Sequence, residues 1–155
     1  MTVFERLTAL LDSRGTIYEV SRHAPVFTSE EAARVRGAQL ASGAKALICK
    51  AGENFVLFVM PADRRLDSKL ARRALGVRGM RFATREEVEE LTTLLPGSIP
   101  PFGQLFGFKT YCDENLTAQT RINFNAGDHS ISVNMACTDY LAVEQPAMGH
   151  YSEAG

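Results

Sequence analysis

Lys45 is the residue whose position in the sequence is least expected. It lies in the apolar stretch Ala44–Lys50, where a strand would place its side chain on the same face as Leu47 and Cys49. A lysine on such a face has to reach water or a ligand, because lysine is rarely buried. Two interpretations follow: a strand-end lysine that extends into solvent, or a cation held in a pocket for a phosphate or carbonyl group.

A second unusual segment is Gly-Ser-Ile-Pro-Pro-Phe-Gly at residues 97–103. Its prolines fix φ and its glycines allow sharp turns, so the loop can hold backbone carbonyls and amides in set positions. A plain connector between a helix and a strand is equally consistent with this composition. Ser98 is not at a nucleophile elbow, because the G-x-S-x-G frame is absent.

The three histidines form no metal or catalytic motif by themselves. His23 falls at a strand end and His129 in a turn, where surface or capping roles are more common than catalysis. No HxxxH, HExxH or Cys/His spacing predicts a metal site, and no phosphate-binding or dinucleotide fingerprint predicts a cofactor. We therefore expect a protein with no metal and no cofactor.

The three cysteines indicate core thiols. Cys49, Cys112 and Cys137 are odd in number, far apart and set among apolar neighbours. A small ester or thioester hydrolase that pairs Cys112 or Cys137 with His129 is the weakest of the functional alternatives, because only the fold could bring these residues together.

The overall composition is that of a water-soluble globular domain. Of 155 residues, 45% are hydrophobic and 23% charged, and no apolar run approaches the roughly 18 residues that a bilayer requires. The first ten residues lack the pattern of a secretory signal, so we expect a cytoplasmic protein without a membrane partner. A net charge of −1 argues against binding nucleic acid by bulk electrostatics, and no DNA partner is expected.

The charge is nevertheless unevenly placed along the chain. Between Arg64 and Arg85 there are eight basic residues and one acidic residue, Asp67. Three of them lie on one predicted helix and could contact RNA phosphates: Lys69, Arg72 and Arg73. A solvated helix face is the equally weighted alternative.

Helix starts are marked by threonines that are followed three residues later by glutamate, the pattern of a capping box. The pairs are Thr2 with Glu5, Thr28 with Glu31, and Thr84 with Glu87. The first two helices should end at Gly15 and Gly37, a fourth helix should cover 67–75 and end at Gly76, and a short one should follow Thr138.

Strand patterns occupy the remaining segments. They cover residues 16–21, 44–50, 55–60, 105–112, 121–125 and 130–134, with a hairpin at 51–54 and a second turn at 126–128. The mixture predicts an α/β fold of the α+β type, with a mixed, curled and barrel-like sheet flanked by helices. We expect one domain over residues 1–145 and a loose tail over 146–155.

Taken together, the segments "SRHAPVFTSEEAA", "GAKALICK", "LDSKLARRALG", "PGSIPPFG", "INFNAGDHSISV" and "DYLAV" resemble the YbaK / prolyl-tRNA synthetase-associated editing domain family over residues 3–144. The most specific pieces are Lys45 and the Gly-x-x-x-Pro loop from Gly97 to Pro101. This resemblance implies a YbaK-like fold and hydrolysis of mischarged aminoacyl-tRNA. The implied partners are the acceptor end of the tRNA and, in some systems, an aminoacyl-tRNA synthetase.

The resemblance also implies roles for individual residues. Lys45 would engage the terminal adenosine, and Gly97 would position the attacking water, which makes these two the expected catalytic residues. The expected substrate-binding residues are His23, Phe27, Thr28, Ser98, Ile99, Pro101, Gly103, His129 and Ser132.

Three departures from the family pattern leave the substrate open. Alanine-specific members often have Asn after the lysine, where this chain has Ala46, and YbaK-type members have Tyr and Asp where it has Ser21 and Ser132. We expect a deacylase in trans for small amino acids such as Ala, Cys or Ser. Because no acidic residue or His stands at the two motif positions, water attack would be assisted by the substrate itself. The alternative is a silent tRNA-end-binding module that acts as a sensor or adaptor.

Overall fold

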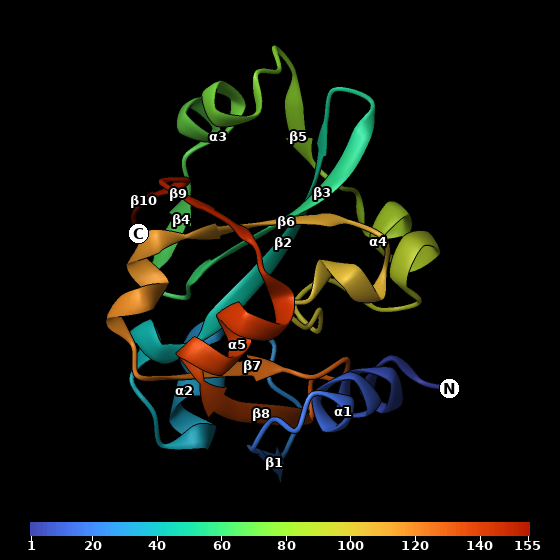
Figure 1. The fold of residues 1–155 in the computed structure, drawn as a ribbon, viewed down its shortest axis with the longest axis vertical. Coiled ribbons are helices and arrows are strands. Elements are labelled where there is room, and N and C mark those ends of the chain that lie inside the picture. The colour runs from blue at the N-terminus through green and yellow to red at the C-terminus, as the bar shows by residue number, and fades with distance from the viewer.

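Ten strands form three separate sheets in the computed structural model, which describes all residues from 1 to 155 (Figure 1). The strands are β1 (Tyr18–Arg22), β2 (Ala44–Ala51), β3 (Asn54–Pro61), β4 (Arg64–Leu66), β5 (Met80–Phe82), β6 (Lys109–Asp113), β7 (Arg121–Asn125), β8 (Ile131–Ala136), β9 (Ala147–Gly149) and β10 (Ser152–Ala154). Their orders are β5-β2-β3-β6-β9, β1-β8-β7 and β10-β4. The largest sheet is mixed, because β3 pairs with β2 antiparallel and with β6 parallel.

Five α-helices cover these sheets: α1 (Val3–Ser13), α2 (Ser29–Arg36), α3 (Ser68–Leu75), α4 (Arg85–Thr92) and α5 (Cys137–Glu144). Thr2 and Thr84 form complete capping boxes with Glu5 and Glu87. Thr28 caps α2 through its hydroxyl alone. The predicted helix starts are therefore confirmed, since side-chain capping depends on residues only three positions apart. None of the helices is both long and apolar enough to cross a membrane.

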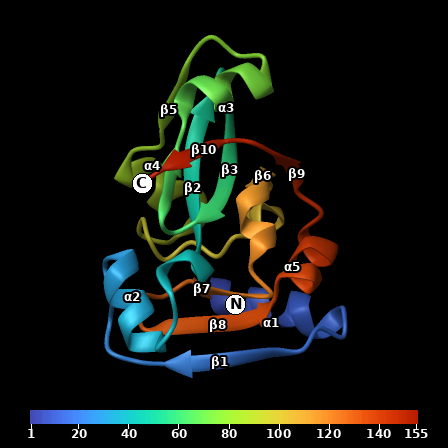
Figure 2. The same cartoon turned by 90° about the vertical axis from the view of Figure 1, so that its left-hand side faces the viewer.

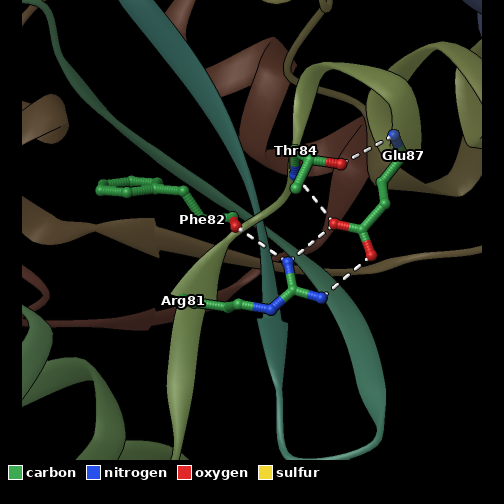
Figure 3. Close-up of polar contacts among 4 residues, drawn as sticks. All are labelled: Arg81, Phe82, Thr84 and Glu87. Carbon is green, nitrogen blue, oxygen red and sulfur yellow. Dashed lines mark hydrogen bonds and ion pairs between the residues drawn. The ribbon is translucent and has the colours of Figure 1, made fainter.

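The start of α4 is tied to the neighbouring strand β5 by an ion pair (Figure 3). Arg81 donates two hydrogen bonds to the Glu87 carboxylate, at 2.7 and 3.0 Å, and a third to the carbonyl of Phe82 at 3.2 Å. These bonds, with that from the Thr84 amide, hold the pKa of Glu87 at about 2. Arg81 is thus committed to a structural contact.

The main core lies between the five-stranded and three-stranded sheets. Most of its 22 buried residues come from β2, β3, β7 and β8, from α1 and α5, and from the loop after α4, and Val88 of α4, Cys112 of β6 and Leu116 also belong to it. A smaller core of seven residues lies on the other face of β2 and β3 and includes Ala71 of α3 and Tyr151. Helices α3 and α2 lie toward opposite ends of the long axis of the molecule (Figures 1 and 2).

The predicted fold class is confirmed, with two differences in detail. The strands stay in three sheets and close no barrel. The strand predicted over 105–112 begins only at Lys109, because residues 103–105 form a 3-10 helix. The strand predicted over 55–60 is buried on both faces as expected, and the hairpin at 51–54 joins β2 to β3.

The prediction of a loose tail at 146–155 is wrong. Within it, β9 pairs with β6 and β10 pairs with β4. Tyr151 is 4% exposed, and its ring contacts Phe58 and Tyr111. Its amide donates to the buried Asp113 carboxylate at 2.8 Å. Small and polar residues suggested disorder, but partners far away in the sequence order this segment.

Candidate functional site

A cleft opens between α2, the first residues of β2, β7 and the loop that contains Gly97. Its volume is about 810 Å³ when the open mouth is included. In Figure 2 this region lies in the lower half, where α2, β7 and β8 sit below β2 and β3. Six of the expected site residues line the cleft: Phe27, Thr28, Lys45, Gly97, Ile99 and His129.

Lys45 enters the cleft from the beginning of β2. It pairs with Met60 of β3. Its side chain is on the same face of β2 as that of Leu47, which packs against the smaller core. Its ammonium group makes no hydrogen bond or ion pair within the chain, which leaves it free for a ligand. Burial lowers the pKa of Lys45, while the carboxylates of Asp63 and Glu30 act in the opposite direction.

Gly97 occupies a backbone conformation that favours glycine, with φ of +90°. A Cβ atom there would lie 3.4 Å from Nε2 of His129. The amide of Ser98 donates to the carbonyl of Leu95 at 3.2 Å, whereas the amides of Gly97 and Ile99 have no partner in the chain. These two amides are therefore not committed to a contact within the chain.

His129 and Phe27 form one wall of the cleft. Their rings are tilted by 35° with centroids 4.8 Å apart. Nε2 of His129 lies 3.2 Å from the carbonyl of Pro96, and because a carbonyl can only accept, this nitrogen carries the hydrogen. The Phe27 side chain is 71% exposed, which places a free aromatic surface at the mouth of the cleft.

Five of the expected substrate-binding residues do not line this cleft, and three of them, Ser98, Pro101 and Gly103, lie on the core side of the loop. Ser98 is buried, and its hydroxyl donates to the Leu95 carbonyl at 2.8 Å. Pro101 accepts from the Tyr140 hydroxyl at 2.7 Å, and Gly103 donates to the Thr110 hydroxyl at 3.1 Å. In this structure they hold the loop from its core side, and the expectation that they touch substrate stays a prediction.

His23 and Ser132 lie beside the cleft. His23 lines an adjoining groove, and its Nε2 atom is 2.8 Å from the hydroxyl of the buried Ser132. The cleft and the groove share Arg36 and Asn123. Sequence reasoning missed Arg36 and Asn125, since an arginine in the last turn of a helix and an asparagine before a turn are both ordinary.

The cleft is cationic. Its charged side chains are Lys45 and Arg36, and no Asp, Glu or Cys residue lines it. Burial lowers the pKa of Arg36 to about 10, so the guanidinium remains charged at neutral pH. Such a cleft favours a ligand with phosphate, carbonyl or other electron-rich groups.

The cysteines are unsuited to nucleophilic attack. Cys49, Cys112 and Cys137 are free and buried, and none lines the cleft. Burial raises the pKa of the Cys49 and Cys112 thiols to about 12. A thiol in this state contains little of the thiolate that a nucleophile requires.

The basic residues of α3 lie apart from the cleft, near the other end of the molecule (Figures 1 and 2). Lys69 and Arg73 are exposed and have no hydrogen-bonding partner, and Arg72 donates to the carbonyls of Ser68 and Arg78 at 3.3 Å. Only a ligand much longer than a nucleotide could contact both regions.

Comparisons with known proteins agree in pointing to one family. The family model described as an aminoacyl-tRNA editing domain matches residues 23–143. A relative from Escherichia coli K12, described as the multifunctional Ser/Thr-tRNA deacylase ProXp-y, is 37% identical over 95% of this chain and 91% of its own length. The prolyl-tRNA editing protein ProX of Acetoanaerobium sticklandii is 24% identical over 90% of this chain and 88% of its own.

A solved structure shows the same architecture. The crystal structure of a candidate trans-editing enzyme for prolyl tRNA synthetase has a TM-score of 0.88 to this chain and 27% sequence identity. The match covers 99% of both chains.

Proposed function

The chain belongs to the aminoacyl-tRNA editing domain family, and from this premise we propose that it hydrolyses the ester bond of mischarged aminoacyl-tRNA in trans. The observation that carries the proposal is the cationic cleft, where the unpaired Lys45 faces a loop with two unpaired amides, those of Gly97 and Ile99. A cation and two free amide donors suit a substrate that has a phosphate at one end and an ester carbonyl at the other.

Each end of such a substrate has a counterpart in the cleft. Lys45 would bind the terminal nucleotide, and the exposed ring of Phe27 offers a stacking surface for its base. Base stacking on an aromatic side chain contributes about 1–3 kcal/mol. The amides of Gly97 and Ile99 would bind the ester oxygen as it gains charge during water attack.

We propose small amino acids as the acyl group, namely Ala, Cys or Ser, with Ser first. The relative from E. coli is described as a Ser/Thr-tRNA deacylase, and Ser is common to both sets. A synthetase discriminates one methylene by only about 1–3 kcal/mol, so a second site that excludes the larger, correct amino acid removes the errors of the first.

A panel of purified aminoacyl-tRNAs tests the proposed function. We expect the protein to deacylate tRNAs that carry Ser, Ala or Cys at least tenfold faster than tRNA carrying a larger, cognate amino acid. Plain amino acid esters without tRNA should react slowly, because they lack the nucleotide that Lys45 holds. No release of any amino acid above the spontaneous rate would reject deacylation and favour a binding module.

We further propose that Lys69, Arg72 and Arg73 contact tRNA phosphates outside the cleft. An acceptor end that reaches into the cleft belongs to a duplex stem long enough to approach α3. Each neutralised duplex phosphate adds about 0.9 to the slope of log K against log salt concentration.

The salt dependence of tRNA binding tests this contact. Lys69→Gln combined with Arg73→Gln should weaken binding and lower the salt slope by up to about two units. Arg72 is left intact, because its hydrogen bonds to the carbonyls of Ser68 and Arg78 support the end of the helix. Arg14→Gln, at the end of α1 and away from α3, is the control and should leave the slope unchanged. Equal slopes for all three proteins would assign the α3 residues to a solvated surface.

A further inference from the structure

A continuous chain of hydrogen bonds links His23, the residue after strand β1, to the Gly97 loop. His23 Nδ1 lies 2.9 Å from its neighbour's carbonyl, and its Nε2 atom 2.8 Å from Ser132 Oγ. Arg36 donates from Nε to Ser132 Oγ at 2.9 Å and from its NH2 nitrogen to Asn125 Oδ1 at 3.0 Å. Asn125 then donates from Nδ2 to the carbonyl of Gly97 at 2.7 Å.

Arg36 stands at the centre of this chain without a carboxylate partner. None of the ion pairs of the protein includes it, and the cleft that it lines contains no Asp or Glu. A largely buried cation with no counter-ion is costly to keep in a fold. Its place in the lining of a cleft therefore points to a role in the site, in addition to its hydrogen bonds to two neutral side chains.

The guanidinium also decides how the Asn125 amide is oriented. A guanidinium can only donate hydrogen bonds, so the oxygen of Asn125 has to face Arg36. The NH2 group of Asn125 then has to face the Gly97 carbonyl. Without Arg36 the amide could rotate and present its oxygen to that carbonyl, which would repel it.

The peptide that Asn125 contacts is the one at the proposed reaction centre. The Gly97 carbonyl and the Ser98 amide belong to the same peptide plane, and the amide donates to the Leu95 carbonyl. This plane is therefore held from both sides. The peptides on either side carry the Gly97 and Ile99 amides, which have no partners in the chain, and their carbonyls contact Nε2 of His129 at 3.2 Å and the Gly127 amide at 2.9 Å.

We propose that Arg36 is a positioning residue of the deacylation reaction: through Asn125 it fixes the central peptide of the Gly97 loop, between the two peptides whose amides would bind the ester. This inference rests on the proposed function for its catalytic consequence. The orientation of the loop itself can be measured independently.

The kinetic test compares three variants with the wild type on Ser-charged tRNA. Arg36→Gln and Asn125→Asp should each lower kcat about 10- to 100-fold, with KM changed by less than about threefold. The first variant loses the charge-assisted hydrogen bond to Asn125, and the second loses the donor to the Gly97 carbonyl, while the tRNA contacts remain. Arg36→Lys should recover little, since one ammonium cannot reproduce the fork that reaches both Ser132 and Asn125. Arg34→Gln, exposed on the same helix, is the matched control and should behave as the wild type.

A double variant tests whether the two residues act in series. Arg36→Gln combined with Asn125→Asp should be no slower than the worse single variant, because the second change acts on a link that is already broken. Multiplicative losses would show independent roles and overturn the proposal. A raised KM with unchanged kcat in Arg36→Gln would assign Arg36 to direct substrate binding, which also overturns it.

Amide hydrogen exchange supplies a measurement that does not depend on activity. The Ser98 amide should exchange at least tenfold faster in Arg36→Gln and in Asn125→Asp than in Arg34→Gln, at equal global stability measured by thermal unfolding. If the wild type fails to deacylate any tRNA, the proposed function falls while the exchange result still decides the positioning role. Unchanged exchange at Ser98 in both variants would reject that role.

Discussion

Replacing Lys45 with methionine should lower kcat/KM for deacylation by about 10- to 100-fold and leave the folded state at least as stable as the wild type. The ammonium has no partner in the chain, so its loss removes a contact to the ligand only. Loss of a hydrogen bond to a charged group costs about 1.5–3 kcal/mol, which corresponds to this range of rates.

The pKa of Lys45 determines the sign of the stability effect. Burial lowers this pKa, which means that the folded protein holds the charged form less favourably than the unfolded chain does. At neutral pH the charge therefore opposes folding, and a neutral side chain of similar length removes that penalty. Thermal unfolding of Lys45→Met at pH 7 should show an equal or higher midpoint than the wild type.

Two further variants complete the Lys45 experiment. Lys50→Met, near the hairpin end of the same strand, is the control and should keep full activity. Lys45→Arg should restore part of the activity, because it keeps a cation at the same place. A Lys45→Met protein with full activity would remove Lys45 from the site, and one that fails to fold would show that its role is structural.

Removing one hydroxyl from the substrate should have an effect of similar or larger size. A tRNA that ends in 2′-deoxyadenosine, and carries Ser on the 3′ oxygen, should bind normally but be cleaved about 10²–10⁴-fold more slowly, the range that general acid–base catalysis supplies. Neither a carboxylate nor a thiol lines the cleft, and Nε2 of His129 already donates to the Pro96 carbonyl. The vicinal hydroxyl of the substrate is then the group placed to help the water.

The measurement is single-turnover cleavage of the two substrates under saturating enzyme. Spontaneous hydrolysis of each substrate at the same pH is the control, because the hydroxyl also affects the intrinsic reactivity of the ester. Equal enzymatic rates, after this correction, would contradict substrate assistance. His129→Ala and His23→Ala would then identify which imidazole acts as the base.

The local elements could be predicted from the sequence because short-range interactions determine them. Thr2 and Thr84 mark two helix starts through hydroxyls that cap amides three residues later. The apolar runs on either side of residues 51–54 specify the hairpin of β2 and β3 in the same way. Such signals depend on neighbours in the chain, and the fold around them changes them little.

The short strands at the end of the chain could not be found in this way. Strand β10 pairs Ser152 with Leu66, 86 positions earlier, and neither segment has a strand pattern of its own. Tyr151, just before β10, is buried, and its ring contacts Phe58 and Tyr111. Tertiary packing thus decides the secondary structure of segments that are too short to have a clear strand propensity of their own.

For the site, the sequence by itself determined that a lysine at the start of a buried strand and a stiff Gly-x-x-x-Pro loop would be present. The tertiary structure decided that Lys45 and Gly97 line one cleft, and that Ser98, Pro101 and Gly103 lie on the core side of the loop. It also decided that Arg36 meets Asn125, 89 positions away, and that Asn125 meets Gly97, 28 positions away. Residue type and spacing fix what a side chain can donate or accept, but only the packing of distant segments chooses its partner.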